Sequence, residues 1–165
     1  MRDMFLERDA VLSDCGVYRY LLRRTWDHTK PRALLVMLNP STADANIDDP
    51  TIRSCVRLTK GLGYGSFEVV NLFAFRATDP KALFTAADPY GPKCNDIIEA
   101  AINRCDMAIC AWGAHPMARD RGRNVWSTLK SYRPEVFCFD RTKDGAPKHP
   151  LYIKSGTELK AWRPA

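Results

Sequence analysis

Three polar side chains have types and positions that suit the recognition of a flat, polar ligand. Asn39 opens an Asn-Pro-Ser turn, Asn71 lies inside an apolar run, and His149 precedes a proline. A buried amide needs partners for both its donor and its acceptor groups, so Asn71 is either a structural tie or a ligand reader. Phe73 lies close by and offers an aromatic face. Together these groups suit a nucleobase, which is held by its pairing edge and by stacking.

The elements that must position these groups are four short apolar runs, at residues 33–38, 67–72, 107–112 and 136–139. Runs of this length without alternation are typical of strands covered on both faces. Helices are predicted between them, over about 50–60, from Asn95 to Cys105, and over about 117–130. Asp49 is the expected N-cap of the first helix and Asn95 of the second. Residues 9–25 are predicted to form a β-hairpin.

This alternation of strand and helix predicts one α/β domain over residues 1–165. We expect a three-layer α/β/α fold with a mostly parallel central sheet and an N-terminal β-hairpin. In such sheets ligands bind beyond the carboxyl ends of the strands. That rule selects the loops at 39–44, 73–80, 113–116 and 140–150. Asn39, Asn71 and His149 are therefore expected to meet at one edge of the sheet.

The positive charge is unevenly distributed. The 165 residues carry a formal net charge of +6, and residues 119–148 hold eight Lys and Arg against four Asp and Glu. A basic flank of this kind fits a polyanionic partner, although a solvated surface is an equally weighted alternative. The residues expected to bind nucleic acid are Arg119, Arg121, Arg123, Arg141, Lys143 and Lys148.

Several longer motifs resemble a bacterial and phage family catalogued as a domain of unknown function. They are Leu-Asn-Pro-Ser-Thr-Ala-Asp at 38–44, Asp-Asp-Pro-Thr-Ile-Arg at 48–53, Gly-Tyr-Gly at 63–65, Val-Val-Asn-Leu-Phe-Ala at 69–74, Arg-Ala-Thr-Asp-Pro at 76–80 and Gly-Ala-Pro-Lys-His-Pro-Leu-Tyr at 145–152. Motifs of this length are specific, but the family implies no reaction.

The order of the polar motifs also resembles, more distantly, the uracil-DNA glycosylase superfamily, especially its mismatch-specific branch. By that resemblance Asn39 positions the attacking water, Asn71 reads the base, and His149 stabilises the charge on the departing base. Phe73 is expected to stack on the base. The other substrate-binding residues expected at this site are Pro40, Ser41, Asp44 and Arg76.

The chemistry of N-glycosidic hydrolysis suits such groups. It produces an oxocarbenium-like sugar and an anionic base, so it needs oriented donors and a placed water more than a strong nucleophile. No metal and no cofactor is expected. The segment after His149 lacks the Ser/Gly-rich loop with which these glycosylases enter a duplex. We therefore expect DNA as the partner, single-stranded or carrying modified bases, with a free nucleoside left open.

Two other functions remain open from the sequence. In a metal-dependent nucleotide or phosphodiester hydrolase, Asp44, Asp48 and Asp49 would hold Mg²⁺ while His115 or His149 assists. A non-catalytic nucleic-acid-binding module would keep the pocket without the chemistry, and its affinity would fall steeply with salt.

Location and assembly follow from composition. No stretch approaches the roughly 18 consecutive apolar residues of a membrane-spanning helix, and residues 1–8 lack the apolar core of a signal peptide. The six cysteines include no Cys-x-x-Cys pair, so most are expected to be reduced core thiols. We expect a cytoplasmic monomer that does not bind a membrane.

Overall fold

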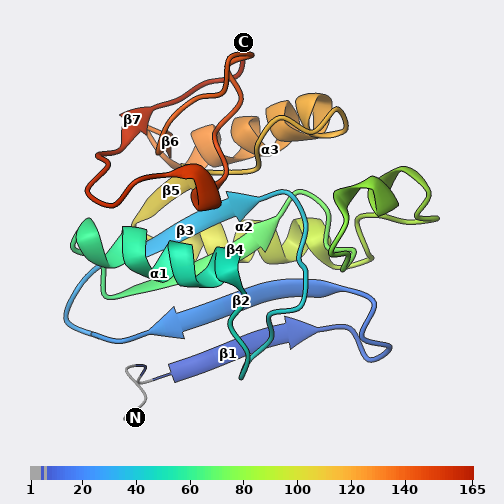
Figure 1. The fold of residues 1–165 in the computed structure, drawn as a ribbon, viewed down its shortest axis with the longest axis horizontal. Coiled ribbons are helices and arrows are strands. Elements are labelled where there is room, and N and C mark those ends of the chain that lie inside the picture. Colours follow the sequence, from blue (N-terminus) through green and yellow to red (C-terminus); the bar gives the residue numbers. More distant parts are fainter. Residues whose placement is uncertain (1–4, 6) are drawn as a thin grey trace.

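The part of the chain that the structure describes forms a seven-stranded sheet flanked by helices (Figure 1). A computed structural model describes residue 5 and residues 7–165. Across this described part the strands follow the spatial order β1-β2-β4-β3-β5-β6-β7. Their bounds are β1 Glu7–Leu12, β2 Arg19–Thr25, β3 Arg32–Met37, β4 Ser66–Asn71, β5 Met107–Cys110, β6 Phe137–Cys138 and β7 Lys160–Ala161.

The sheet is mixed, whereas the sequence led us to expect a mostly parallel one. The pairings β3–β4, β3–β5 and β5–β6 are parallel, and β1–β2, β2–β4 and β6–β7 are antiparallel. The expected N-terminal hairpin is present as β1 and β2, and its second strand joins the sheet beside β4. The short strand β7 adds an antiparallel pairing at the far edge. Both additions give backbone partners to what would otherwise be edges of the parallel strands.

Within residues 7–165, three α-helices connect the strands: α1 Pro50–Gly61, α2 Cys94–Arg104 and α3 Ala118–Tyr132. Two 3₁₀ helices, η1 Pro80–Phe84 and η2 Pro150–Tyr152, lie in the loops. The expected N-cap of α1 is confirmed, because Asp49 Oδ1 accepts the Ile52 N–H at 2.9 Å. The expected cap of α2 is wrong. That helix begins at Cys94 without a side-chain cap, and the Asn95 side-chain oxygen Oδ1 instead accepts a hydrogen bond from Arg121 at 2.6 Å.

Helices cover both faces of the sheet (Figure 1). One core cluster joins α1 to alternate residues of the central strands, among them Leu35 and Val69. The other joins α2 and α3 to the intervening residues, among them Val36 and Val70. Because side chains alternate along a strand, Asn71 shares the α1 face with Val69. No helix in residues 7–165 is long and apolar enough to cross a membrane.

A buried charge lies toward the amino end of β4, where the sequence had indicated only an apolar run. The Glu68 side chain is 0% exposed and pairs with Arg23 at 2.6 Å, Arg104 at 3.0 Å and Arg32 at 3.4 Å. Burial alone would raise the pKa of Glu68, but hydrogen bonds from Arg104 and Arg23 outweigh it, so this pKa lies below its ordinary value. The network ties the end of α2 to β2, β3 and β4.

Candidate functional site

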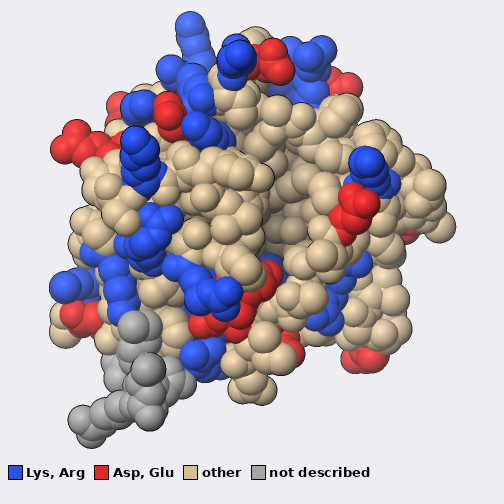
Figure 2. Space-filling view, viewed as in Figure 1, with Lys and Arg blue, Asp and Glu red and all other residues tan. Residues whose placement is uncertain are grey.

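The structure places Asn39, Asn71 and His149 at the carboxyl edge of the parallel strands. Asn39 follows β3 by two residues, and Asn71 is the last residue of β4. His149 lies beside the loop after β5, since a Cβ added at Gly113 would come within 3.9 Å of the His149 Cβ. Figure 2, viewed as in Figure 1, shows a hollow in the surface over this edge. No hydrogen bond joins these three described side chains to one another, so any ligand would have to bridge them.

Asn71 is buried with an unused donor. It is 2% exposed, it lies beside Met37 in the β3–β4 register, and its Nδ2 has no hydrogen-bond partner. Leaving a buried donor unpaired costs about 1–3 kcal/mol, so native structures rarely do so without a reason. An acceptor on a ligand would remove that cost.

Asn39 has a fixed orientation. Its Nδ2 donates to the carbonyls of Pro40 at 3.1 Å, Ala77 at 3.0 Å and Phe75 at 3.4 Å. These contacts tie the turn after β3 to the loop after β4. They also use the amide nitrogen, while Oδ1 accepts no hydrogen bond from any described residue. Oδ1 is therefore the atom that can orient a water molecule.

His149 has a half-buried, neutral imidazole ring, and one of its two nitrogens already accepts a hydrogen bond. Its Nδ1 accepts the Leu151 N–H at 3.2 Å, which places the proton of the neutral ring on Nε2. Burial lowers the pKa of His149, and the negative charge of Asp49 opposes this only in part. At neutral pH the ring is therefore uncharged and offers an Nε2–H donor.

The loop between β3 and α1 is held by arginines through its carbonyl groups. Arg76 was expected to bind substrate, but its guanidinium donates to the carbonyls of Ser41 at 3.2 Å, Gly16 at 3.4 Å and Thr42 at 3.5 Å. The Ser41 hydroxyl lies 3.4 Å from that of Thr78, and Pro40 is buried. These contacts give the loop a defined shape before any ligand binds.

The aspartates of this loop are also engaged in structural contacts. Asp44 Oδ1 accepts the N–H groups of Asn46 and Ile47, which lowers the pKa of this carboxyl. Asp48 pairs with the buried Arg24 at 2.8 Å, and Asp49 caps α1. Among the described residues no group of three His, Cys, Asp or Glu side chains could hold a metal ion. The arrangement gives the metal-dependent alternative no support.

Phe73 lies in the core rather than in the site. It is 0% exposed, packs in the cluster of α2 and α3, and its ring centroid lies 5.3 Å from that of Tyr90. The regular strand ends at Asn71, so the alternation that would place Phe73 on the α1 face stops there. In this conformation its ring is not available to stack on a base.

The residues expected to bind nucleic acid divide into two groups. Arg121 points inward, donating to the Leu72 carbonyl at 3.0 Å and lying 4.9 Å over the Tyr90 ring, so we now assign it a structural role. Arg123 and Arg141 are exposed, but each donates to a carbonyl of the C-terminal segment at 2.9 Å. The side chains that carry no hydrogen bond or ion pair to described residues are those of Arg119, Lys143 and Lys148.

Arg19 is a further candidate that the sequence analysis did not single out. It is 3% exposed, its Nη1 donates to the Ala43 carbonyl at 2.9 Å, and its Nε has no partner. Burial lowers the pKa of Arg19 to about 10, and the carboxylate of Asp49 acts in the opposite direction. The side chain is still a cation at neutral pH. Its signal in the sequence is an arginine within the apolar run at 17–22.

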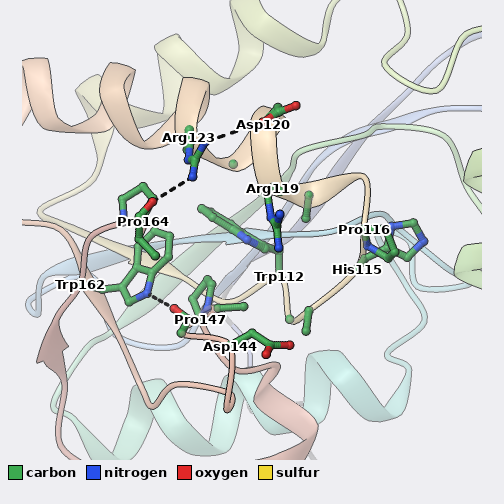
Figure 3. Close-up of a pocket in the computed structure, with 17 residues that line it drawn as sticks. Trp112, His115, Pro116, Arg119, Asp120, Arg123, Asp144, Pro147, Trp162 and Pro164 are labelled. Atoms are coloured by element: carbon green, nitrogen blue, oxygen red, sulfur yellow. Dashed lines mark hydrogen bonds and ion pairs between the residues drawn. The ribbon is translucent and has the colours of Figure 1, made fainter.

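A cavity of about 570 Å³ lies next to this edge (Figure 3). Residues after β5, the start of α3 and residues 144–147 line it, and Arg119 and Arg123 are among them. Asn39, Asn71 and Phe73 do not line it. The cavity is therefore a neighbour of the Asn39–Asn71–His149 region and is not its centre.

Comparison with known proteins identifies the family but no reaction. The family described as "protein of unknown function (DUF1643)" matches residues 19–151, and the chain belongs to it. This agrees with the family suggested by the sequence motifs. No curated protein and no solved structure matches the chain.

Proposed function

We propose that this DUF1643 protein hydrolyses the N-glycosidic bond of a modified or mismatched nucleobase in DNA. The base would be held at the carboxyl edge of the sheet. The observation that carries the proposal is the buried, unpartnered Nδ2 of Asn71. A carbonyl or ring nitrogen on the pairing edge of a base is the acceptor that this donor lacks.

The neighbouring groups suit the other needs of the reaction. As the bond from the sugar C1′ to the base nitrogen breaks, its electron pair moves to the base. A neutral His149 can donate from Nε2 to the base oxygen on which this charge develops. Asn39 Oδ1 can hold the water that adds to C1′, because its amide nitrogen is fixed by three carbonyls, and the proton that this water loses neutralises the departing base anion.

Arg19 fits the same reaction as a buried cation. In a water-poor site a positive charge stabilises a departing anion more strongly than it would in bulk water. Arg19 forms no ion pair with a described carboxylate, although the charge of Asp49 opposes the lowering of its pKa. Its hydrogen bond to Ala43 also holds the loop that carries Asn39.

The proposal is tested by incubating the protein with single-stranded oligonucleotides that each contain one deaminated, alkylated or oxidised base. Mass spectrometry detects released base, and alkaline cleavage scores abasic sites. We expect release from at least one substrate in the presence of EDTA. Asn39→Ala and His149→Ala should each slow it by about 10²–10³-fold, the effect of losing one preorganised group.

Asn71→Ala should act differently, by reducing discrimination between related bases, because their pairing edge loses its reader. Asn103→Ala is the matched control, since this exposed amide lies on α2 and donates only to the Glu99 carbonyl. Absence of release from every substrate contradicts the proposal. So does full activity in folded Asn39→Ala and His149→Ala proteins.

A further inference from the structure

The cavity beside the proposed base site plays no part in the reaction described above. Trp112 and Trp162 are among the residues that line it, but they are only 5% and 6% exposed and pack edge to face on each other, with ring centroids 5.2 Å apart and planes at 88°. Pro116, Pro147 and Pro164 extend this apolar lining. At about 570 Å³ the cavity falls within the size range of small-molecule sites. Its walls suit a ligand with a flat apolar part.

A cation without a partner reaches into this cavity. Arg119 is exposed and makes no hydrogen bond or ion pair with any described residue, and Figure 3 shows its side chain extending into the cavity beside Trp112. Arg123 differs, because it donates to the Ala165 carbonyl at 2.9 Å and lies 3.9 Å from Asp120. Arg119 is therefore the side chain placed to bind an anion here.

A carboxylate approaches from the other side. Figure 3 shows Asp144 at the side of the cavity opposite α3, and no ion pair joins it to Arg119. Asp120 points away and pairs with Arg123. A simple inorganic anion would be repelled by Asp144, and a neutral molecule would make no use of Arg119. A ligand with a phosphate at one end and sugar or base N–H and O–H donors at the other uses both.

The cavity adjoins the proposed base site through the backbone. The Gly113 N–H donates to the Pro147 carbonyl at 2.8 Å, both residues line the cavity, and His149 follows Pro147 by two positions. We infer that the cavity binds a second nucleotide of the same strand, next to the one whose base is released. Arg119 would hold its phosphate, and its base would lie against the apolar lining of the cavity.

This inference rests on the proposed function and narrows its substrate. A nucleotide seated in the cavity cannot stay stacked and paired in a duplex. Opening a duplex at two neighbouring positions costs unstacking energy at both. The substrate class indicated is therefore single-stranded DNA.

The test measures binding, without any requirement for catalysis. The protein is titrated with a short single-stranded oligothymidylate, with the same sequence in a duplex, and with inorganic phosphate, while tryptophan emission is recorded. We expect the single strand to change the emission, the duplex to bind more weakly, and phosphate alone to have no effect at equal concentration. Arg119→Ala should weaken single-strand binding about tenfold or more, as expected for the loss of a charge-assisted hydrogen bond.

Two variants separate the cavity from general charge effects. Lys154→Ala removes an exposed cation outside the cavity and should bind like the parent protein. Arg119→Lys keeps the charge and should recover part of the affinity. Unchanged binding by a folded Arg119→Ala protein overturns the inference, and so does equal binding of duplex and single strand.

The failures of the two proposals are distinguishable. Arg119-dependent binding without base release would leave the nucleotide site standing and remove the glycosylase activity. Base release that is unaffected by Arg119→Ala, with unchanged affinity, would remove the cavity assignment alone.

Discussion

The two ends of strand β4 differ in how their buried carboxylate, amide and guanidinium groups are paired. Toward its amino end, the Glu68 carboxylate is paired with Arg23, Arg32 and Arg104. At its carboxyl end, Asn71 Nδ2 has no partner, and Arg19 Nε on the adjacent strand is also unpartnered. The amino end also has one unpartnered buried hydroxyl, that of Thr25 opposite Ser66, so the contrast between the two ends concerns their charged and amide groups.

This difference separates stability from function. A paired buried charge fixes the packing of the elements around it, because removing one partner leaves the others uncompensated. An unpaired buried donor does not stabilise the fold, and it forms a hydrogen bond only when a ligand supplies an acceptor. The comparison therefore points to the carboxyl end as the working end of the sheet, and substitutions at the two ends should differ in kind.

The largest expected effect is at Glu68. Glu68→Gln keeps the size of the side chain but leaves three guanidinium groups without their shared charge, so we expect a loss of about 3–5 kcal/mol in the free energy of unfolding. Urea denaturation measures it. Glu99→Gln, at an exposed position of α2, is the control and should change stability by less than about 0.5 kcal/mol. A loss below about 1 kcal/mol at Glu68 would contradict this account of the amino end.

Much of the fold follows from local sequence signals. The apolar runs locate the four parallel strands, and the Asp-Pro pair locates the start of α1. The pairing of β2 with β4 has no comparable signal, because a hairpin pattern does not specify which edge of a sheet it joins. The strand Lys160–Ala161 is too short to show a period.

The candidate site could be predicted less completely than the fold, because tertiary contacts compete for its side chains. Asn71 was visible as an amide in an apolar strand, and the carboxyl-edge rule placed it with Asn39 and His149. Arg121 looked like a surface cation, yet it is drawn inward by the Leu72 carbonyl and the Asn95 side chain. Such tertiary partners lie far apart in the chain, so no local pattern reveals them.

Packing at the carboxyl end is tight even though its donors are open. A Cβ added at Gly122 in α3 would lie 2.7 Å from the Trp112 ring, so Gly122→Ala should cost about 1–3 kcal/mol by overpacking, despite the better helix propensity of alanine. Gly61→Ala in α1 meets nothing within 4 Å and should be neutral or slightly stabilising. Thermal unfolding of both variants decides the point. Equal stability of the two variants would show that the Trp112 ring shifts easily to make room for the added methyl group.

At Asn71 we expect a small effect on the free energy of unfolding, and it should be neutral or stabilising, unlike that of most substitutions at buried positions. Asn71→Leu removes the unpaired donor and keeps a similar branched shape, so we expect stability to be unchanged or raised by up to about 1 kcal/mol. The same variant should lose discrimination between bases. A destabilisation like that of Glu68→Gln would instead mean that the amide is satisfied in solution by ordered water, and Asn71 would then be a structural tie.

The smallest expected effect is a difference between the two ends in pH dependence. The pKa of His149 is lowered in the folded protein by burial, so the unfolded chain takes up this proton first as pH falls below about 6.5. Stability from His149 is therefore present above that pH and declines below it. Glu68 also has a lowered pKa, and its contribution is lost only at more acidic pH, below its ordinary value of 4.5. Between pH 7.5 and 5.5, the parent protein should lose stability, and His149→Gln should reduce that loss by less than about 1 kcal/mol. An unchanged slope in His149→Gln would show that the imidazole is hydrated in the folded state, which would remove the reason for treating it as a neutral donor.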